Sequence, residues 1–297
     1  MDNIIINADC IEHLKTIEDN YFDSVVTDPP YHLTSIAKRF TNSTKAKYGK
    51  DGSFQRLSKG FMGKEWDGGD IAFTTDLWKE VYRTIKPGAV LLAFAATRNY
   101  HRMAVAIEDA GFEIFDMINW IYGSGFPKKR NLLKPAHEPI VMARKGVNKH
   151  LNLDECRVGD FVQDTSKNRR NVDHKKNIYE LGLKGESPYG ITKGRWPANV
   201  MHEGLDEIWS DYFYCAKANK KEKGDTKHPT VKPLELMRYL VRLVTPKDGL
   251  VLDPFAGTGT TGEACILEGR NYYLIEKTKE YIPDIEKRIN KYDRLGI

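Results

Sequence analysis

Positions 250–262 read LVLDPFAGTGTTG, an apolar run that passes directly into a glycine-rich turn and then into a helical pattern. The apolar run Leu250 to Leu252 predicts a buried strand, and Thr260 to Leu267 predicts the helix that follows. Such a turn is a common place for a nucleotide-type ligand, because glycine lets the backbone approach the ligand closely. About nineteen residues after Gly257, Glu276 ends the next predicted strand, where its carboxylate could accept hydrogen bonds from ribose hydroxyls.

The rest of the chain repeats the alternation of strands and helices. Further apolar strand patterns occur at Ile4 to Ile6, Ser24 to Thr27, Val90 to Ala95 and Tyr272 to Ile275. Helical patterns occur at Leu77, Val81 and Ile85, at Tyr100 to Ala110, after Pro233, and at Ile282, Ile285 and Ile289. This alternation predicts an α/β fold with a parallel, doubly wound sheet.

The glycines also fit a second interpretation. Gly257, Gly259 and Gly262 have the spacing of a dinucleotide fingerprint, so a nicotinamide-dependent oxidoreductase is one alternative. A dinucleotide needs two mononucleotide-binding halves, and too little chain follows Glu276 to form the second. We therefore disfavour the oxidoreductase interpretation.

A second turn, Asp28-Pro29-Pro30-Tyr31, follows the predicted strand that ends at Thr27. At average residue frequencies this tetrapeptide arises by chance in about one chain in a thousand. The prolines fix φ and donate no backbone hydrogen bond, so the carbonyls of Asp28 and Pro29 are free to accept. Two acceptors suit an exocyclic amine, whose hydrogens they would hold as its nitrogen becomes tetrahedral. Tyr31 would offer an extruded base a face for stacking.

With these two turns the chain resembles the amino-methyltransferases of DNA, which combine a D-P-P-Y motif with an F-x-G-x-G motif. D-P-P-Y comes first here, as in the permuted beta class. The segments 8–12 (ADCIE) and 227–233 (KHPTVKP) are similar to the family's cofactor segments, and the resemblance covers about residues 1–145 and 225–290. Within the middle, 194–200 and 213–217 are similar to phage and prophage members.

The resemblance implies a Rossmann-like, doubly wound, mostly parallel sheet of seven strands in circularly permuted order. Residues 1–145 would form the catalytic half, with 31–70 as a lid and DNA-binding loop, and 226–297 the cofactor-binding half. Residues 146–225 would be an inserted target-recognition region, whose fold the sequence leaves open. The implied cofactor is S-adenosyl-L-methionine. The implied substrate is double-stranded DNA, with one base flipped out for direct methyl transfer to its amino group.

The resemblance also assigns site residues. The catalytic turn would be Asp28, Pro29, Pro30 and Tyr31. The cofactor would contact Asp9, Cys10, Lys227, His228, Pro229, Thr230, Asp253, Pro254, Phe255, Gly257, Gly259, Thr260 and Glu276. Asp9 has an alternative role as a helix N-cap. Adenine N6 is preferred to cytosine N4 as the target, because the family's cytosine enzymes more often carry Ser in place of Asp28.

The net charge of +5 is unevenly distributed. Residues 32–60 hold seven Lys or Arg against one acid, and 123–232 hold 22 against 14. Two basic regions on an acidic scaffold are typical of a polyanion footprint, although solvated loops are an equal alternative. The expected DNA contacts are Lys38, Arg39, Lys45, Lys47, Lys128, Lys129, Arg130 and Arg195.

Several other classes are disfavoured by the sequence. The four cysteines form no C-x-x-C pair, which argues against a disulfide framework and a metal site, and none follows a proline as in C5-cytosine methyltransferases. No apolar run approaches the roughly 20 residues that span a bilayer, so we expect a cytoplasmic protein with no membrane partner. Methylation of RNA or protein and a non-catalytic nucleic-acid-binding role stay open as alternatives. A homodimer and a cognate restriction enzyme stay open as partners.

Overall fold

The computed structural model describes residues 3–31, 70–122, 133–146, 151–164, 191–202, 213–215, 217–223, 226 and 230–293. Within them the main sheet has the strand order β1 (Ile4–Asn7), β11 (Asn271–Glu276), β10 (Leu250–Asp253), β2 (Phe22–Thr27), β3 (Ile85–Phe94), β5 (His137–Arg144), β4 (Glu113–Ile121), β8 (Val200–His202) and β9 (Phe213–Tyr214). Neighbouring strands are parallel except β5, which is antiparallel to both of its neighbours. The expected mostly parallel sheet is confirmed, and β8 and β9 extend its seven strands at one edge.

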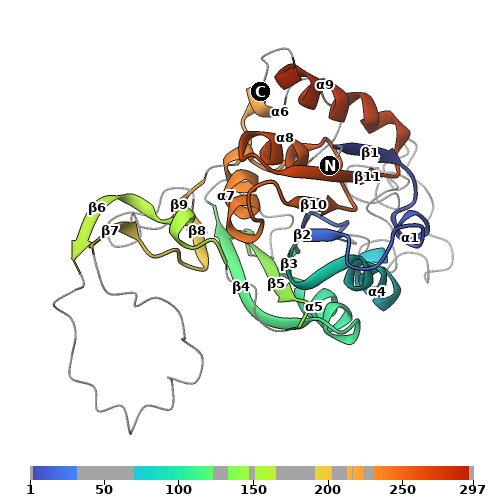
Figure 1. The fold of residues 1–297 in the computed structure, drawn as a ribbon, viewed down its shortest axis with the longest axis horizontal. Coiled ribbons are helices and arrows are strands. Elements are labelled where there is room, and N and C mark those ends of the chain that lie inside the picture. Colours follow the sequence, from blue (N-terminus) through green and yellow to red (C-terminus); the bar gives the residue numbers. More distant parts are fainter. Residues whose placement is uncertain are drawn as a thin grey trace, which may run out of the picture.

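Helices cover both faces of the sheet (Figure 1). One face carries α1 (Cys10–Leu14), α4 (Thr75–Thr84) and α5 (Tyr100–Asp109), and the other carries α7 (Leu234–Val244), α8 (Thr260–Leu267) and α9 (Ile282–Asp293). The shorter helical elements are η4 (Ile71–Phe73), η5 (Asp154–Cys156), α6 (Lys220–Lys223) and η9 (Lys279–Tyr281). Strand β3 shows how two cores arise, because Leu92 and Phe94 pack into the core under α7 while Leu91 and Ala93 pack into the core under α4.

One boundary differs from the sequence prediction. The pattern placed Ile85 on a helix with Leu77 and Val81, but α4 ends at Thr84 and Ile85 begins β3. Ile85 has an extended backbone and lies opposite Phe22 of β2. It is buried in the same core as Val81, so the four-residue apolar spacing continues past the end of the helix.

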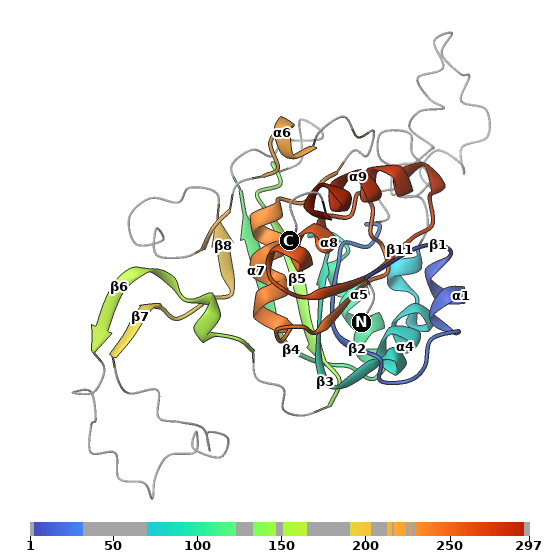
Figure 2. The same ribbon diagram turned by 45° about the horizontal axis from the view of Figure 1, so that its top comes forward.

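The middle of the chain contributes to two different sheets. Strands β6 (Val158–Asp164) and β7 (Ile191–Arg195) form a separate antiparallel ribbon, which extends away from the main sheet in both views (Figures 1 and 2). Strands β8 and β9 instead continue the main sheet beyond β4, where the indole of Trp120 donates a 2.8 Å hydrogen bond to the carbonyl of Cys215. Part of the expected insertion is therefore integral to the main sheet.

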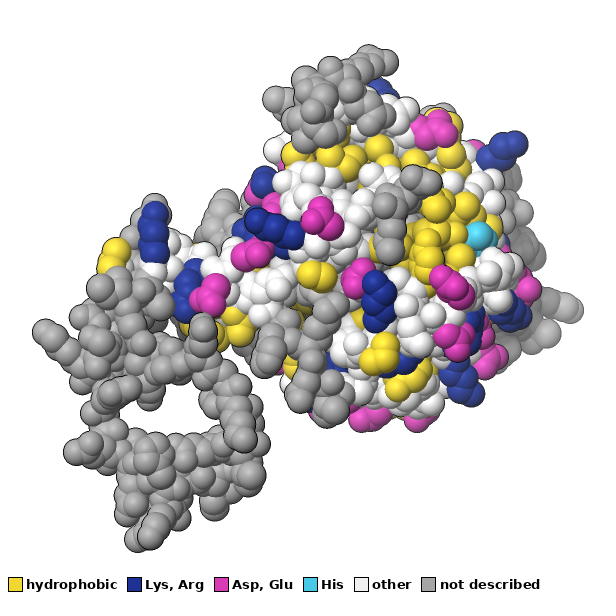
Figure 3. All heavy atoms as spheres, in the orientation of Figure 1, with side chains coloured by type: hydrophobic (Ala, Val, Ile, Leu, Met, Phe, Trp, Pro, Cys, Tyr) yellow, Lys and Arg dark blue, Asp and Glu magenta, His cyan; other side chains and the backbone are white. Residues whose placement is uncertain are grey.

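The described surface carries charges of both signs. On the face shown in Figure 3, basic and acidic side chains are interspersed over the body of the protein. Residues 32–60, the segment with the higher density of net positive charge, lie outside the described residues, as does part of 123–232. None of the helices in the described ranges has the length and hydropathy needed to cross a membrane.

Candidate active site

The two turns singled out in the sequence lie side by side. Strand β2 ends at Thr27 and runs parallel to β10, with Val25 opposite Leu252, so the two strands deliver their turns to the same edge of the sheet. The hydroxyl of Thr27 donates a 2.8 Å hydrogen bond to Oδ1 of Asp253. The turns at Asp28 and Gly257 therefore meet at adjacent strand ends.

Asp253 ties the two turns together. Its Oδ1 accepts hydrogen bonds from Thr27 and from the backbone N–H of Phe255 (3.0 Å), and its Oδ2 accepts one from the hydroxyl of Thr261 (2.5 Å). The residue is 3% exposed, and burial raises the pKa of its carboxyl to about 6. With three protein donors on this carboxylate, we infer that Asp253 shapes the cofactor turn rather than contacting the cofactor through its side chain.

Glycine is required in the turn for conformation and for space. Gly257 and Gly259 have φ of 55° and 77°, in the left-handed region. A Cβ at Gly259 would lie 2.8 Å from Cγ2 of Ile285 on α9. Helix α8 begins at Thr260, directly after this turn, so its N-terminal backbone N–H groups lie next to the turn. Pro254 and Phe255 complete the turn, with Phe255 half-buried against the core under α4.

Glu276 ends β11 at this edge, and Asp9 follows the end of the neighbouring β1 by two residues, since Asn7 pairs with Glu276. The carboxylate of Glu276 accepts hydrogen bonds from the backbone N–H of Gly257 (2.8 Å) and Thr278 (2.7 Å), and burial raises its pKa. Each of its oxygens keeps a further lone pair, which suits the expected contact with ribose hydroxyls.

Asp9 takes the N-cap role that the sequence left open. Its Oδ1 accepts hydrogen bonds from the backbone N–H groups of Ile11 (3.1 Å) and Glu12 (3.4 Å), and its Oδ2 pairs with Lys277 at 3.0 Å. Burial acts to raise the pKa of Asp9, but the hydrogen bond and charge of Lys277 outweigh it and the net shift is downward. Cys10 is 4% exposed and packs in the core, and burial raises the pKa of its thiol to about 12.

Asp28 lies in a cluster of polar side chains that the sequence did not reveal. Its Oδ2 is 2.5 Å from Nζ of Lys232, which also lies 3.3 Å from Oε2 of Glu138. The hydroxyl of Tyr31 donates a 3.1 Å hydrogen bond to that same Oε2. Asn99 fixes the turn from another side, because its amide donates a 2.7 Å hydrogen bond to the carbonyl of Tyr31.

The other carboxylate oxygen of Asp28 has a different environment. Oδ1 is buried and has no hydrogen-bond partner among the described residues. A buried carboxylate oxygen without a donor is costly, so such atoms commonly mark the place of a ligand or substrate donor. Pro29 is buried behind it, and Pro30 and Tyr31 are half-buried, so the turn is rigid and presents its acceptors at the sheet edge.

The remaining predicted site residues fall into two groups. Thr230 and Arg195 are described and exposed, with Arg195 on β7. Lys227, His228, Pro229, Lys38, Arg39, Lys45, Lys47, Lys128, Lys129 and Arg130 lie outside the described residues, so their roles stay predictions. Among the residues that sequence reasoning missed, Lys232 belongs to the segment 227–233 quoted above, whereas nothing near Glu138 in the sequence marks it as part of a site.

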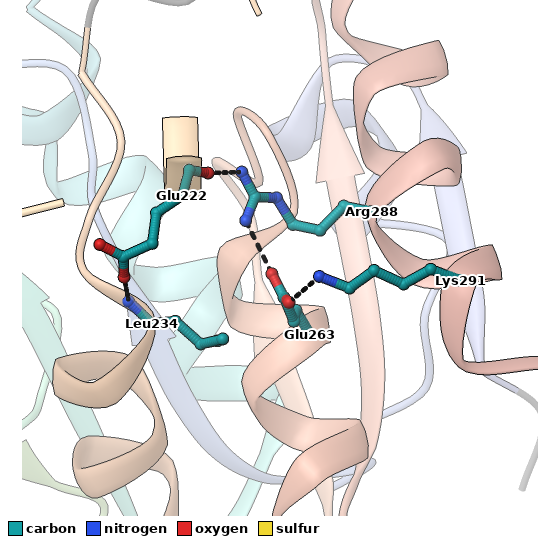
Figure 4. A pocket seen from close by; sticks show the side chains of 5 residues that line it. All are labelled: Glu222, Leu234, Glu263, Arg288 and Lys291. Carbon is teal, nitrogen blue, oxygen red and sulfur yellow. Dashed lines mark hydrogen bonds and ion pairs between the residues drawn. The ribbon is translucent and has the colours of Figure 1, made fainter. Parts of the chain in front are cut away.

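A hollow of about 330 Å³ on the side of α8 and α9 does not belong to this site (Figure 4). Glu263 lies in it, ion-paired with Arg288 at 2.7 Å and with Lys291. Arg288 also donates to the carbonyls of Thr258 (2.9 Å) and Glu222 (3.2 Å). These contacts hold the glycine turn against α9 from behind, which is a structural role.

The geometry agrees with comparisons to known proteins. A family model described as DNA methylase matches residues 22–287. Type II methyltransferase M.HpaI of Haemophilus parainfluenzae is 27% identical over 98% of this chain and 75% of its own length, and M.HindIII of Haemophilus influenzae is 27% identical over 93% and 92%.

Solved structures show the same fold. The M1.HpyAVI–SAM complex has a TM-score of 0.54 at 21% identity, covering 96% of this chain and 98% of that one. The cytosine-N4-specific PvuII DNA methyltransferase has a TM-score of 0.57 at 17% identity, covering 99% and 93%. Since the family model spans most of the chain, the protein belongs to the DNA methylase family of N6 and N4 amino-methyltransferases.

Proposed function

We propose that this protein transfers a methyl group from S-adenosylmethionine to the N6 amino group of adenine in double-stranded DNA, with the target base flipped out of the helix. The observation that carries the proposal is the buried Oδ1 of Asp28, which has no partner among the described residues and lies at the strand end next to the glycine turn. An exocyclic amine would supply the missing donor.

The described residues fit the cofactor. The glycines at 257 and 259 let the turn take its left-handed conformation, and Glu276 keeps acceptor capacity for ribose hydroxyls. Asp9 lies just after the end of the neighbouring β1, where it would bind the adenine end of the cofactor. Solved relatives support this, since the M1.HpyAVI structure and one from Thermus thermophilus are complexes with the same cofactor. When bound, S-adenosylmethionine supplies a methyl group on a positively charged sulfur.

The chain's own groups would then act by positioning and electrostatics. Oδ1 of Asp28 and the carbonyl of Pro29 accept the two amino hydrogens and draw the nitrogen toward tetrahedral geometry. The ring of Tyr31 stacks on the flipped base. No nucleophile of the protein is needed. The four cysteines are all buried, and burial raises the pKa of the thiols of Cys10 and Cys156 to about 12.

Adenine is proposed over cytosine because the turn carries Asp28, where the family's cytosine enzymes more often carry Ser. Mass spectrometry of nucleosides from DNA treated with the enzyme should show N6-methyladenine. Detection of 4-methylcytosine alone would reverse the choice of base and leave the methyltransferase assignment intact.

The role of Asp28 is tested by Asp28→Ala, with Asp109→Ala on the exposed end of α5 as a matched control. Loss of a group that meets developing charge costs about 10²-fold or more in rate, so Asp28→Ala should reduce methyl transfer at least that far. The control should keep the original rate. A well-folded Asp28→Ala enzyme with unchanged activity would disprove the assigned role.

The basic segment after the catalytic turn is proposed to contribute to DNA binding. Each phosphate contact steepens the dependence of log affinity on log salt by about 0.9. Replacing Lys38, Lys45 and Lys47 by Gln should therefore reduce the measured slope by about 2 to 3. An unchanged slope would remove these residues from the DNA footprint.

A further inference from the structure

A buried lysine connects the catalytic turn to a carboxylate on a different strand. Lys232 lies two residues before α7, its side chain is 10% exposed, and its ammonium lies 2.5 Å from Oδ2 of Asp28. Glu138 lies on β5, and its Oε2 is 3.3 Å from the same ammonium. One cation therefore lies between two carboxylates that come from separate strands.

The phenol of Tyr31 completes the cluster. Nζ of Lys232 donates to its Oη at 3.1 Å, and the phenol donates to Oε2 of Glu138 at 3.1 Å. Burial raises the pKa of Tyr31 well above its usual value, and the charges of Asp28 and Glu138 add to the effect. Burial alone would lower the pKa of Lys232, but the same two carboxylates outweigh it and raise the pKa. The phenol is thus kept protonated and the lysine charged.

These contacts determine how Asp28 is presented. Lys232 pairs with Oδ2 of Asp28 and so fixes the orientation of the carboxylate. Oδ1 is then left buried, without a hydrogen-bond donor among the described residues. Two carboxylates and one ammonium also leave the cluster with one negative charge in excess. When the carbon–sulfur bond of the donor breaks and the nitrogen–carbon bond forms, the sulfur would become a neutral thioether and the amino nitrogen would carry positive charge until it releases one proton to solvent. An excess of fixed negative charge beside the nitrogen stabilises that change. A lysine paired with Asp28 alone would cancel this charge.

We propose that Lys232 and Glu138 are positioning residues for methyl transfer. Lys232 fixes the orientation of Asp28 and Tyr31. The negative charge of Glu138 offsets the positive charge of Lys232, so that the negative charge of Asp28 is not cancelled. The proposal rests on the proposed function in that Asp28 is taken to meet the target amine.

The test compares Lys232→Met, Glu138→Gln and the double variant in single-turnover methyl transfer to a DNA duplex. Misplacing a reacting group by about 1 Å can cost 10²-fold, so Lys232→Met should lower the rate about 100-fold. Without the ammonium the two carboxylates repel each other, and this repulsion should turn Asp28 away. Glu138→Gln should cost about tenfold, the loss expected for one hydrogen bond to a charged group.

The double variant separates positioning from general damage. With Glu138→Gln added, the repulsion is gone, so the double variant should recover about tenfold of the rate lost in Lys232→Met. If the two substitutions acted only by damaging the packing, their losses of rate would add, and the double variant would be slower than Lys232→Met. Cofactor affinity, measured by calorimetry, should stay within about twofold in all three variants, because the loss is confined to the chemical step.

Lys86→Met serves as the matched control, since Lys86 pairs with Asp23 at 3.0 Å near the opposite end of β2. It should lower the melting temperature by less than Lys232→Met, because the Lys86 side chain is 36% exposed, and it should leave the transfer rate within about twofold. A Lys232→Met enzyme that keeps its rate, or a double variant slower than Lys232→Met, would overturn the proposal. If the wild-type protein methylates only cytosine, the proposed choice of base is wrong. The positioning proposal can still be tested, because the rate of each variant relative to wild type can be measured with either product.

Discussion

The buried carboxylate of Asp253 should make folding stability depend on pH in a way that one substitution removes. This side chain holds the Asp28 turn and the glycine turn together through Thr27, Phe255 and Thr261. Asp253→Asn keeps the shape of the side chain but cannot ionise. Its amide oxygen can still accept from Thr27 and Phe255, and its NH₂ can donate to the hydroxyl of Thr261.

The size of the effect follows from the pKa of the group. Burial raises the carboxyl pKa from its usual 3.8 to about 6. Between these values the folded state of Asp253 holds a proton that the unfolded chain has released, so its contribution to stability falls as pH rises. Above about pH 6 the free energy of unfolding is lowered by about 3 kcal/mol in all. About 2 kcal/mol of this decrease occurs between pH 4.5 and 7.5.

Urea unfolding of both proteins at pH 4.5 and 7.5 measures this directly. The free energy of unfolding of Asp253→Asn relative to wild type should rise by about 2 kcal/mol between the two pH values, whatever its offset at pH 4.5. Asp109→Asn, on the exposed end of α5, should show no such rise. A rise of less than about 0.5 kcal/mol would show that Asp253 is not kept protonated in the folded state at pH 4.5 to 6, and would refute the assigned cause.

Two further substitutions test the cofactor side of the site. Gly259→Ala should lower the free energy of unfolding by about 1–3 kcal/mol more than Gly269→Ala in denaturant titrations, because both have positive φ but only Gly259 is crowded by α9. If the two variants lose the same free energy of unfolding, backbone strain explains both losses and the contact with α9 contributes nothing. Glu276→Gln should weaken binding of S-adenosylmethionine about tenfold in calorimetry, since the amide cannot accept from Gly257, Thr278 and ribose together. Unchanged affinity would remove Glu276 from the cofactor site.

The sequence was most informative where function restricts the backbone. The glycine turn after Leu252 and the proline turn after Thr27 need unusual backbone geometry, so their residue types reveal them locally. The alternation of apolar patterns then implied parallel neighbours, and the pairing of β2 with β10 confirms that the turns meet. These features depend on short stretches of sequence, which is why they could be predicted.

Other features depend on contacts between distant parts of the chain. Strand β4 is rich in apolar residues, but they do not alternate regularly with polar ones and only Ile118 and Trp120 are buried, so no clear strand pattern stands out. Its partner β8 pairs Asn119 with Val200, far away in sequence. Glu138 has no local signature, because its role comes entirely from meeting Lys232 and Tyr31 in the folded protein.

The order of strands has a consequence for how the protein is made. Strands β1 and β2 are synthesised long before β10 and β11, yet β11 and β10 lie between them in the sheet. Until β10 and β11 are made, β1 has no neighbour in the main sheet and one edge of β2 is open, and unpaired apolar edges favour association between nascent chains. A chain that terminates before Leu250 would carry the Asp28 turn but no partner for it, so methyl transfer should begin only after β10 and β11 have been synthesised.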